Sequence, residues 1–314
     1  MPSTALPDPP VSVSVSVCIC TYRRPAGLRR ALQSVLDAPA PPGHRLELLV
    51  VDNDPQGSAA AVVASLQAVA GDAVLRYLHE PTPGVSHARN RCLDSATADL
   101  LAFIDDDEYT DPQWLPALLA CLEHRQADAV LGPVLPQFEA PPSPWLQAAG
   151  VNDRQRYPTG TVLPWQQART GNVLMRRSLF AGGHRFSTEF ARTGGEDSLF
   201  FASAQQRGKR LVWCDEALVH ESVPAQRMQP AWVLQRAFMG GRTYVRLEAR
   251  RGHRWPYTYF ALRGMAAAAL SALAVAALYP LGGMRHVRHQ CKLYGHLGKV
   301  CARFYSDGPY AGQP

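Results

Sequence analysis

Leu100-Leu-Ala-Phe-Ile-Asp-Asp-Asp-Glu108 joins five apolar residues directly to four carboxylates. The apolar part is typical of a short strand buried on both faces, as in parallel sheets. Open α/β sheets bind ligands beyond the carboxyl ends of such strands. Carboxylates this close repel one another, and Mg²⁺ or Mn²⁺ relieves the repulsion while bridging them to substrate phosphates. The pattern therefore favours a metal or phosphate site over a solvated acidic turn.

Strand-like and helix-like segments alternate around this stretch. Buried or β-branched runs predict strands at 11–20, 46–51, 74–79 and 100–104, with a further strand beginning at 130. Helices are expected between them, near 26–36, 58–69 and 86–96, the last with Ser86 as its N-cap. This order indicates an α/β fold with a parallel, doubly wound sheet. Polar residues at the strand ends, Thr21, Asp52 and Asp105, should then gather on one edge.

Composition sets the broad class of the protein. The chain has 314 residues, 46% hydrophobic and 18% charged, which indicates a folded protein with room for a large α/β domain and appendages. Seven cysteines without framework spacing argue against a secreted disulfide scaffold. Residues 1–10 are polar and Pro-rich and lack the pattern of a signal peptide, so we expect a cytosolic catalytic part.

Charge divides the chain unevenly. Residues 1–235 hold 20 Lys+Arg against 24 Asp+Glu, whereas residues 236–314 hold 12 against 2. A basic end on a mildly acidic body suggests an anionic partner, either nucleic acid or membrane. Within that end, residues 264–284 are uncharged, which makes membrane the better match. A helix lying in the interface fits somewhat better than a span, and a buried helix of a soluble protein is the alternative.

Six short motifs, in this order and spacing, resemble family-2 glycosyltransferases, which are inverting enzymes with the GT-A nucleotide-diphospho-sugar fold. Among members, the chain is most similar to bacterial transferases that build exopolysaccharide repeat units of the succinoglycan type. The likeness covers about residues 12–225. The motifs are Cys20-Thr-Tyr-Arg-Arg-Pro25, Val50-Val-Asp-Asn-Asp54, Gly84-Val-Ser-His-Ala-Arg-Asn90, Phe103-Ile-Asp-Asp-Asp107, Thr170-Gly-Asn172 and Gly194-Gly-Glu-Asp197.

The resemblance implies a set of donor residues. Mn²⁺ or Mg²⁺ would be bound by Asp107, with His220 as a second candidate ligand whose alternative role is structural. The expected nucleobase is uracil, although Pro55 and Gly57 depart from the family pattern beside the predicted base site. Asp52 has helix capping as its alternative role. The residues implied in binding the nucleotide-sugar are Thr21, Arg23, Asp52, Asp54, Arg89, Asp105 and Asp106.

The resemblance also implies an acceptor side. Asp197 would be the general base and Glu196 would position the acceptor, while Asn172 would contact acceptor or sugar. Simple capping of a helix N-terminus is the alternative for the Glu196-Asp197 pair, because the helix dipole favours carboxylates there.

The implied activity is transfer of a sugar from a nucleotide-diphospho-sugar, with UDP expected, to a saccharide or lipid-linked acceptor at the cytoplasmic side of the inner membrane. We expect three parts: a disordered tail at 1–10, a GT-A domain at 11–228 and a basic, helical, membrane-associating region at 229–314. A sugar-nucleotide pyrophosphorylase is an alternative, but the glycines it needs after the first strand are absent from 21–25. The second alternative is a non-catalytic basic binding module.

Overall fold

The chain divides into two compact units. The computed structural model describes residues 13–39, 41, 43–151 and 153–304, so the predicted tail at 1–10 lies outside the described residues. The sheet unit comprises Met1–Val134, Tyr157–Phe186 and Ser203–His220. The helical unit comprises Leu135–Arg156, Ser187–Ala202 and Glu221–Pro314. The boundary expected at residue 228 stays a prediction.

A mostly parallel sheet forms the centre of the sheet unit, as the sequence predicted. Its strand order is β3-β2-β1-β4-β8-β6-β9, and β8 is antiparallel to both of its neighbours. Its strands are β1 (Val13–Thr21), β2 (Arg45–Asp52), β3 (Val74–His79), β4 (Leu100–Asp105), β6 (Ala129–Leu131), β8 (Asn172–Arg176) and β9 (Leu211–Trp213). A second sheet has the order β5-β10-β7 and is built from β5 (Glu108–Thr110), β7 (Val134–Phe138) and β10 (Val219–Val223).

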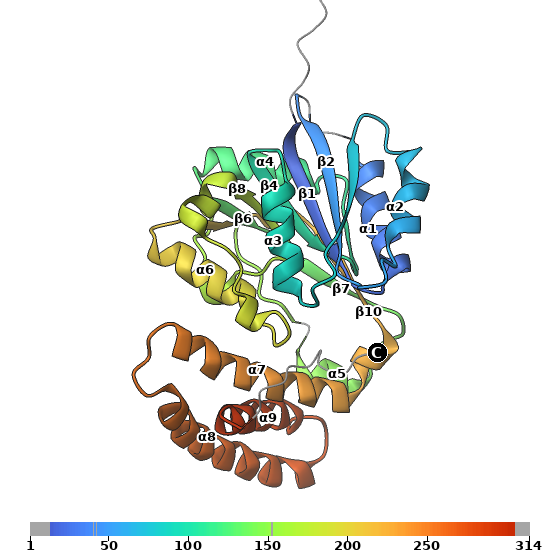
Figure 1. Cartoon of the computed structure of the whole chain (residues 1–314). Helices are drawn as coiled ribbons and strands as arrows, with labels where there is room; N and C mark the ends of the chain where they lie inside the picture. The colour runs from blue at the N-terminus through green and yellow to red at the C-terminus, as the bar shows by residue number, and fades with distance from the viewer. Residues whose placement is uncertain (1–12, 40, 42, 152, 305–314) are drawn as a thin grey trace, which may run out of the picture. The chain divides into compact units, whose positions relative to one another are not determined.

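Helices cover both faces of this sheet because its strands are apolar on both sides. Val15, Val17 and Ile19 of β1 belong to a buried cluster that also contains apolar residues of α1, α2 and α4. Figure 1 shows α3 against the sheet, and its Cys92 Sγ lies 3.7 Å from Cys20 Sγ of β1. The helices of the sheet unit are α1 (Pro25–Asp37), α2 (Ala60–Gln67), α3 (Val85–Ser95) and α4 (Trp114–His124). Helix α5 (Pro144–Ala149) belongs to the helical unit, and α6 (Glu196–Gln206) begins there. Short 3₁₀ turns are η1 (Trp165–Gln167), η2 (Arg177–Gly183), η3 (Thr188–Phe190), η4 (Ala225–Met228) and η5 (Tyr279–Leu281).

The start of α3 corrects one expectation. Ser86 is not the N-cap: the cap is Gly84, and Ser86 is buried within the first turn. Gly84 has φ +133°, a conformation that residues with a side chain rarely adopt. Its N–H donates to Asn53 Oδ1 at 2.7 Å, so the end of β2 fixes where this helix begins.

Three long helices dominate the helical unit: α7 (Pro230–Arg250), α8 (Pro256–Leu278) and α9 (Val287–Cys301). They lie side by side in Figure 1 and meet through glycines. A Cβ added at Gly241 of α7 would lie 2.0 Å from the carbonyl oxygen of Gly295 in α9. A Cβ at Gly298 would lie 1.9 Å from the carbonyl oxygen of Phe238. Backbone therefore packs on backbone, which requires residues without side chains.

Helix α8 has an unusual distribution of side-chain sizes. Its buried positions include the small residues Gly264, Ala268 and Ser271, while Leu270 and Leu273 are 68% and 67% exposed. A helix of a water-soluble protein normally turns its large apolar residues inward. Among the described residues, Pro256–Leu281 is the one helical stretch long and apolar enough to cross a membrane, and most of it is not buried. The helix is thus mostly exposed in this structure, and its association with a membrane stays a prediction.

The glycine contacts predict a contrast between two neighbouring positions of α7. Gly241→Ala should destabilise the protein by about 1–3 kcal/mol or more, because its Cβ overlaps the backbone of α9. Gly240→Ala is the matched control: no heavy atom lies within 4 Å of its Cβ, so it should be neutral or stabilise by about 0.5–1 kcal/mol. Thermal unfolding measures both. Equal melting temperatures for the two variants would contradict the close packing of α7 on α9.

Candidate active site

The polar strand ends meet where the strand order reverses. The chain proceeds from β1 to β2 and β3 on one side, then returns to β4 on the other, which makes the gap between β1 and β4 the switch point of the sheet. Thr21 pairs with Asp52, and Cys20 pairs with Asp105, in the parallel register. The sequence prediction that these ends share one edge is confirmed. In open α/β sheets this position is where ligands bind.

Asp106 is the buried aspartate of the acid run that follows β4. It is 5% exposed, and its Oδ2 accepts hydrogen bonds from Thr21 Oγ1 at 2.9 Å and from the Tyr22 N–H at 3.3 Å. Burial raises the pKa of Asp106 to about 6, although Arg24 and Thr21 act in the opposite direction. These contacts fix the loop that follows β4 against the end of β1.

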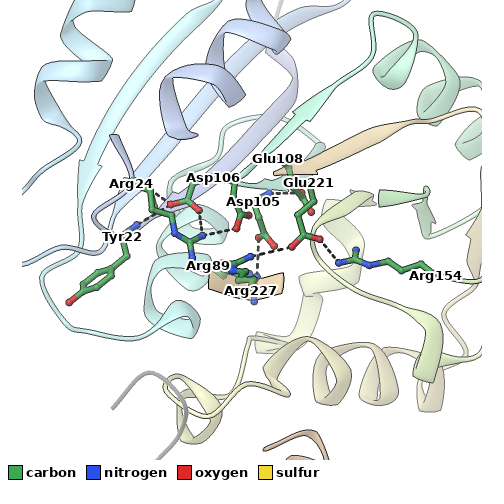
Figure 2. A network of polar contacts seen from close by, with 11 residues as sticks. Tyr22, Arg24, Arg89, Asp105, Asp106, Glu108, Arg154, Glu221 and Arg227 are labelled. Carbon is green, nitrogen blue, oxygen red and sulfur yellow. Dashed lines mark hydrogen bonds and ion pairs between the residues drawn. The ribbon is translucent and has the colours of Figure 1, made fainter. Parts of the chain in front are cut away.

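Arg24 joins two of the acids, and its role was not found from the sequence. Its Nη1 lies 2.9 Å from Asp106 Oδ1 and 2.9 Å from Asp107 Oδ2. Figure 2 shows Arg24 reaching from the end of β1 toward Asp106. Pro25 begins α1 and makes Arg24 its N-cap, and a Cβ at Gly27 would lie 2.4 Å from the Asp106 carbonyl oxygen. The first turn of α1 is thus packed directly on the acid loop.

Asp105 is the more open acid of the cluster. Its side chain is 45% exposed, and Arg89 Nη2 lies 3.4 Å from its Oδ1. Arg89 comes from α3 and is itself 6% exposed, so it is a buried cation presented to the sheet edge. The Asp105 N–H donates to Glu108 Oε2 at 2.8 Å. Glu108 is buried and caps the turn.

Asp52 and Asp54, at the end of β2, hold their own loop. Asp52 is fully buried and accepts from the N–H of Ala59 at 2.7 Å and from Tyr77 Oη at 3.1 Å. Asp54 Oδ1 accepts from Arg23 Nε at 3.2 Å. Burial raises the pKa of the Asp54 carboxyl, but hydrogen bonds, including the one from Gln56 N–H, outweigh it and leave the pKa below its usual value. The capping role weighed for Asp52 is present, and nucleotide contact by either acid stays a prediction.

Two asparagines serve the scaffold. Asn172 is 2% exposed, its Oδ1 accepts from Trp114 Nε1 at 2.8 Å, and its Nδ2 donates to the carbonyls of Pro133 and Ala217 at 2.9 and 2.7 Å. Its predicted contact with acceptor or sugar is untested, and this geometry favours a structural role. Asn90 exchanges two hydrogen bonds of 2.9 Å with the backbone of Phe186. Asn90 therefore fixes the backbone of the loop at Phe186.

His220 lies on β10, beside β5. Its Nε2 is 3.0 Å from Asp111 Oδ1, and its ring stacks on Tyr109 with centroids 5.0 Å apart. Metal binding by His220 stays a prediction. In the helical unit, the next residue, Glu221, accepts from Arg154 at 2.6 Å and from Arg227 at 3.3 Å, the pair of contacts drawn in Figure 2.

The second acid pair begins α6. Glu196 is 5% exposed, and Asp197 is half-buried with its Oδ1 accepting from the Ser198 N–H at 2.6 Å. Gly195 precedes them with φ +102°, and its Cβ would lie 2.5 Å from Thr243 Cγ2 of α7. Helix α7 therefore sets the path of the loop that delivers the pair to the helix N-terminus. The dipole there favours the ionised carboxylates.

Comparison with known proteins now decides the family. The family model described as "Glycosyl transferase family 2" matches residues 16–187, more than half of the chain. This protein belongs to glycosyl transferase family 2. It is therefore a glycosyltransferase, and the pyrophosphorylase and binding-module alternatives are not favoured.

Three similar proteins place this glycosyltransferase more closely. Succinoglycan biosynthesis protein ExoM of Rhizobium meliloti (strain 1021) is 36% identical over 251 residues, covering 78% of each chain. Glucosyl-dolichyl phosphate glucuronosyltransferase of Haloferax volcanii is 25% identical over 246 residues, covering 73% of this chain and 75% of its own. The structure of mannosyltransferase PcManGT from Pyrobaculum calidifontis, solved with GDP-Man and Mn²⁺, superposes with a TM-score of 0.64 at 19% identity, covering 97% of this chain and 91% of its own. That last likeness shows the GT-A fold.

The acid cluster of the glycosyltransferase has the donor chemistry of a divalent-cation site. In the part of the chain that the structure describes, no three His, Cys, Asp or Glu side chains converge on one point. Mg²⁺ and Mn²⁺ commonly bind through one or two carboxylates and complete their coordination with substrate phosphates. The cluster has four consecutive acids, Asp105 to Glu108, and its arginine partners are Arg24 and Arg89, so the local charge suits a cation. Asp107, whose side chain is 18% exposed, has the chemistry of such a ligand, and metal binding by it stays a prediction.

Proposed function

We propose that this family-2 member is an inverting hexosyltransferase that requires Mn²⁺ or Mg²⁺. Its donor is a nucleoside-diphospho-sugar, with a UDP-sugar expected, and its acceptor is a saccharide or a lipid-linked saccharide. The observation that carries the proposal is the acid cluster at the switch point between β1 and β4. GDP-Man and Mn²⁺ in the Pyrobaculum mannosyltransferase support the donor class and the metal. The name of the Rhizobium relative supports a role in exopolysaccharide biosynthesis.

On the donor side, we assign metal binding to Asp107 and nucleotide contact to Asp105 and Arg89. Asp105 is half exposed, and Arg89 offers a fixed, bidentate donor set suited to phosphate or carboxylate. A bound divalent cation would neutralise charge on the departing diphosphate. The other residues predicted to bind the nucleotide-sugar shape its site by fixing the loops at the strand ends. They are Thr21, Arg23, Asp52, Asp54 and Asp106.

On the acceptor side, Asp197 is the proposed general base and Glu196 positions the acceptor. The acceptor hydroxyl oxygen forms a bond to the anomeric carbon while the bond from that carbon to the diphosphate oxygen breaks. The hydroxyl proton passes to Asp197, and the nucleoside diphosphate leaves. Asp197 is half-buried and lies in the first turn of α6. Attack opposite the leaving group inverts the anomeric configuration.

We also propose that the helical unit docks on anionic lipid at the cytoplasmic side of the inner membrane, as a peripheral or monotopic protein, with a single span as the alternative. Residues 236–314 carry 12 Lys+Arg against 2 Asp+Glu. Each basic residue near an anionic surface contributes about 1 kcal/mol. The large exposed residues of α8, among them Leu262, Leu270 and Leu273, supply apolar burial.

Asp107→Asn should abolish metal-dependent binding of the nucleotide-sugar and leave the fold intact, because the amide removes the charge that attracts the cation. Titration with UDP- and GDP-sugars, with and without Mn²⁺, measures the metal-dependent binding. It also identifies which nucleobase the donor carries. Asp94→Asn is the control, since Asp94 is an exposed carboxylate of the same unit paired with Arg185. Full activity of the wild type in excess chelator would rule out metal dependence.

Asp197→Asn should lower turnover by roughly 10²–10⁴-fold while donor affinity changes little, because only proton transfer loses its base. Steady-state kinetics and donor titration separate the two effects. Asp153→Asn, at an exposed carboxylate of the helical unit, should change neither. A collapse of donor binding in the Asp197 variant would place this residue in the nucleotide site instead. NMR of the product tests inversion: an α-linked donor should give a β-linked product.

The full-length protein should float with anionic liposomes at low salt. Leu270→Gln with Leu273→Gln should weaken that binding, whereas Val69→Gln, at an exposed apolar residue of the sheet unit, should not. Alkaline carbonate should strip an interfacial helix from membranes, while a spanning helix stays until detergent is added. Protein that remains in the soluble fraction with anionic liposomes would exclude both arrangements.

A further inference from the structure

A second hollow lies in the helical unit, away from the acid cluster in the sequence. It has a volume of about 470 Å³, within the range of small-molecule sites. Residues of η3, of the last turns of α7 and of the first turn of α8 line it: Glu189, Phe190, Arg246, Ala249, Arg250 and Tyr257. All of them belong to one unit. The proposed donor chemistry gives this pocket no role.

Two guanidinium groups make the pocket basic. Arg246 lies over the Phe190 ring at 5.3 Å, and its Nη2 donates to the Glu189 carbonyl oxygen at 3.4 Å. Arg250 forms an ion pair with the Glu189 carboxylate. Two positive charges therefore face one negative charge. Each guanidinium carries five N–H donors, and these contacts engage only part of that set. A phosphate group matches what remains, because guanidinium groups bind it bidentately.

The pocket adjoins the apolar surface of α8. Tyr257 lines the pocket and is 37% exposed, and Trp255 just before it is 66% exposed. At the same end of α8, Leu262 and Met265 are also exposed, at 60% and 49%. Tyrosine and tryptophan are enriched where a protein meets the boundary between membrane and water. A molecule with an anionic head and a hydrocarbon chain matches both parts of this surface.

Helix α7 connects the pocket to the proposed base. Thr243, Arg246 and Arg250 are spaced i, i+3 and i+7, so they share one face of α7. Thr243 Oγ1 donates to the Thr193 carbonyl oxygen at 3.2 Å and packs beneath Gly195, next to the Glu196-Asp197 pair. The same helix face thus holds the loop of the base and supplies both arginines of the pocket.

We infer that this pocket binds the phosphate or diphosphate of a lipid-linked acceptor, with the lipid chain lying along the exposed face of α8. The inference rests on the proposed function and names the acceptor class for it. Arg246 and Arg250 hold the phosphate head, and the saccharide attached to that head is thereby held on the same helix face as the loop of Asp197.

The test is calorimetric titration of the full-length protein with farnesyl diphosphate, inorganic diphosphate and farnesol, with chelator present to keep the metal-dependent site out of the measurement. Farnesyl diphosphate should bind more tightly than either of its parts. Arg246→Ala and Arg250→Ala should each weaken binding by about tenfold or more, since each loses a charge-assisted hydrogen-bond donor set. Arg254→Ala, the same charge loss at an exposed position outside the pocket, should bind as the wild type does.

Arg246→Lys and Arg250→Lys keep the charge but lose the bidentate geometry, so their affinity for farnesyl diphosphate should lie between those of the wild type and the alanine variants. They provide the test if the alanine variants do not fold. Equal weakening by Arg254→Ala would overturn the inference, because only general charge would then matter. Inorganic diphosphate binding as tightly as farnesyl diphosphate would indicate a free-phosphate site, and full displacement by phosphatidylglycerol vesicles would indicate a site for bulk lipid. Wild-type protein that binds nucleotide-sugar with Mn²⁺ but no farnesyl diphosphate would overturn this inference alone. Absence of donor binding would count instead against the proposed function.

Discussion

Repulsion among the carboxylates at the end of β4 is the constraint around which the sheet unit is arranged. Asp105, Asp106 and Asp107 are consecutive, and ionised groups this close disfavour one another. Three features oppose that cost: the hydrogen bond from Thr21, the shared guanidinium of Arg24 and the buried guanidinium of Arg89. Each comes from a different element, so β1, α1 and α3 must all be in place for the cluster to exist. The packing of Gly27 on the Asp106 carbonyl has the same consequence for the backbone.

The sequence predicted the fold well because its signals were local. Strand β4 and residues 48–51 of β2 are apolar runs, and such runs have few structures other than a doubly buried strand. Once the order of strands and helices was established, the parallel register placed Thr21, Asp52 and Asp105 together without further information. The start of α3 was less predictable, since it depends on a hydrogen bond from Gly84 to Asn53, which is 31 residues away.

The site was predicted less completely, for the same reason. Neighbouring arginines at 23 and 24 look alike in the sequence, yet one pairs with Asp54 and the other bridges Asp106 and Asp107. Which partner each finds depends on the positive φ of Arg23 and on Pro25, which starts α1 immediately afterwards. Burial is equally non-local. Asn172 was expected to contact acceptor or sugar, but its amide is hydrogen-bonded to Trp114, Pro133 and Ala217.

The glycine contacts of the helical unit have a consequence for the solvent in which this unit can exist. Association through large apolar side chains is driven by release of water, and that driving force vanishes when the helices are surrounded by hydrocarbon. Close approach of Gly241 and Gly298 to backbone carbonyls instead relies on dispersion and weak Cα–H···O contacts, which act in either medium. The arrangement of α7 and α9 is therefore independent of whether water or lipid covers α8. Transfer of this surface from one medium to the other requires no repacking of the bundle.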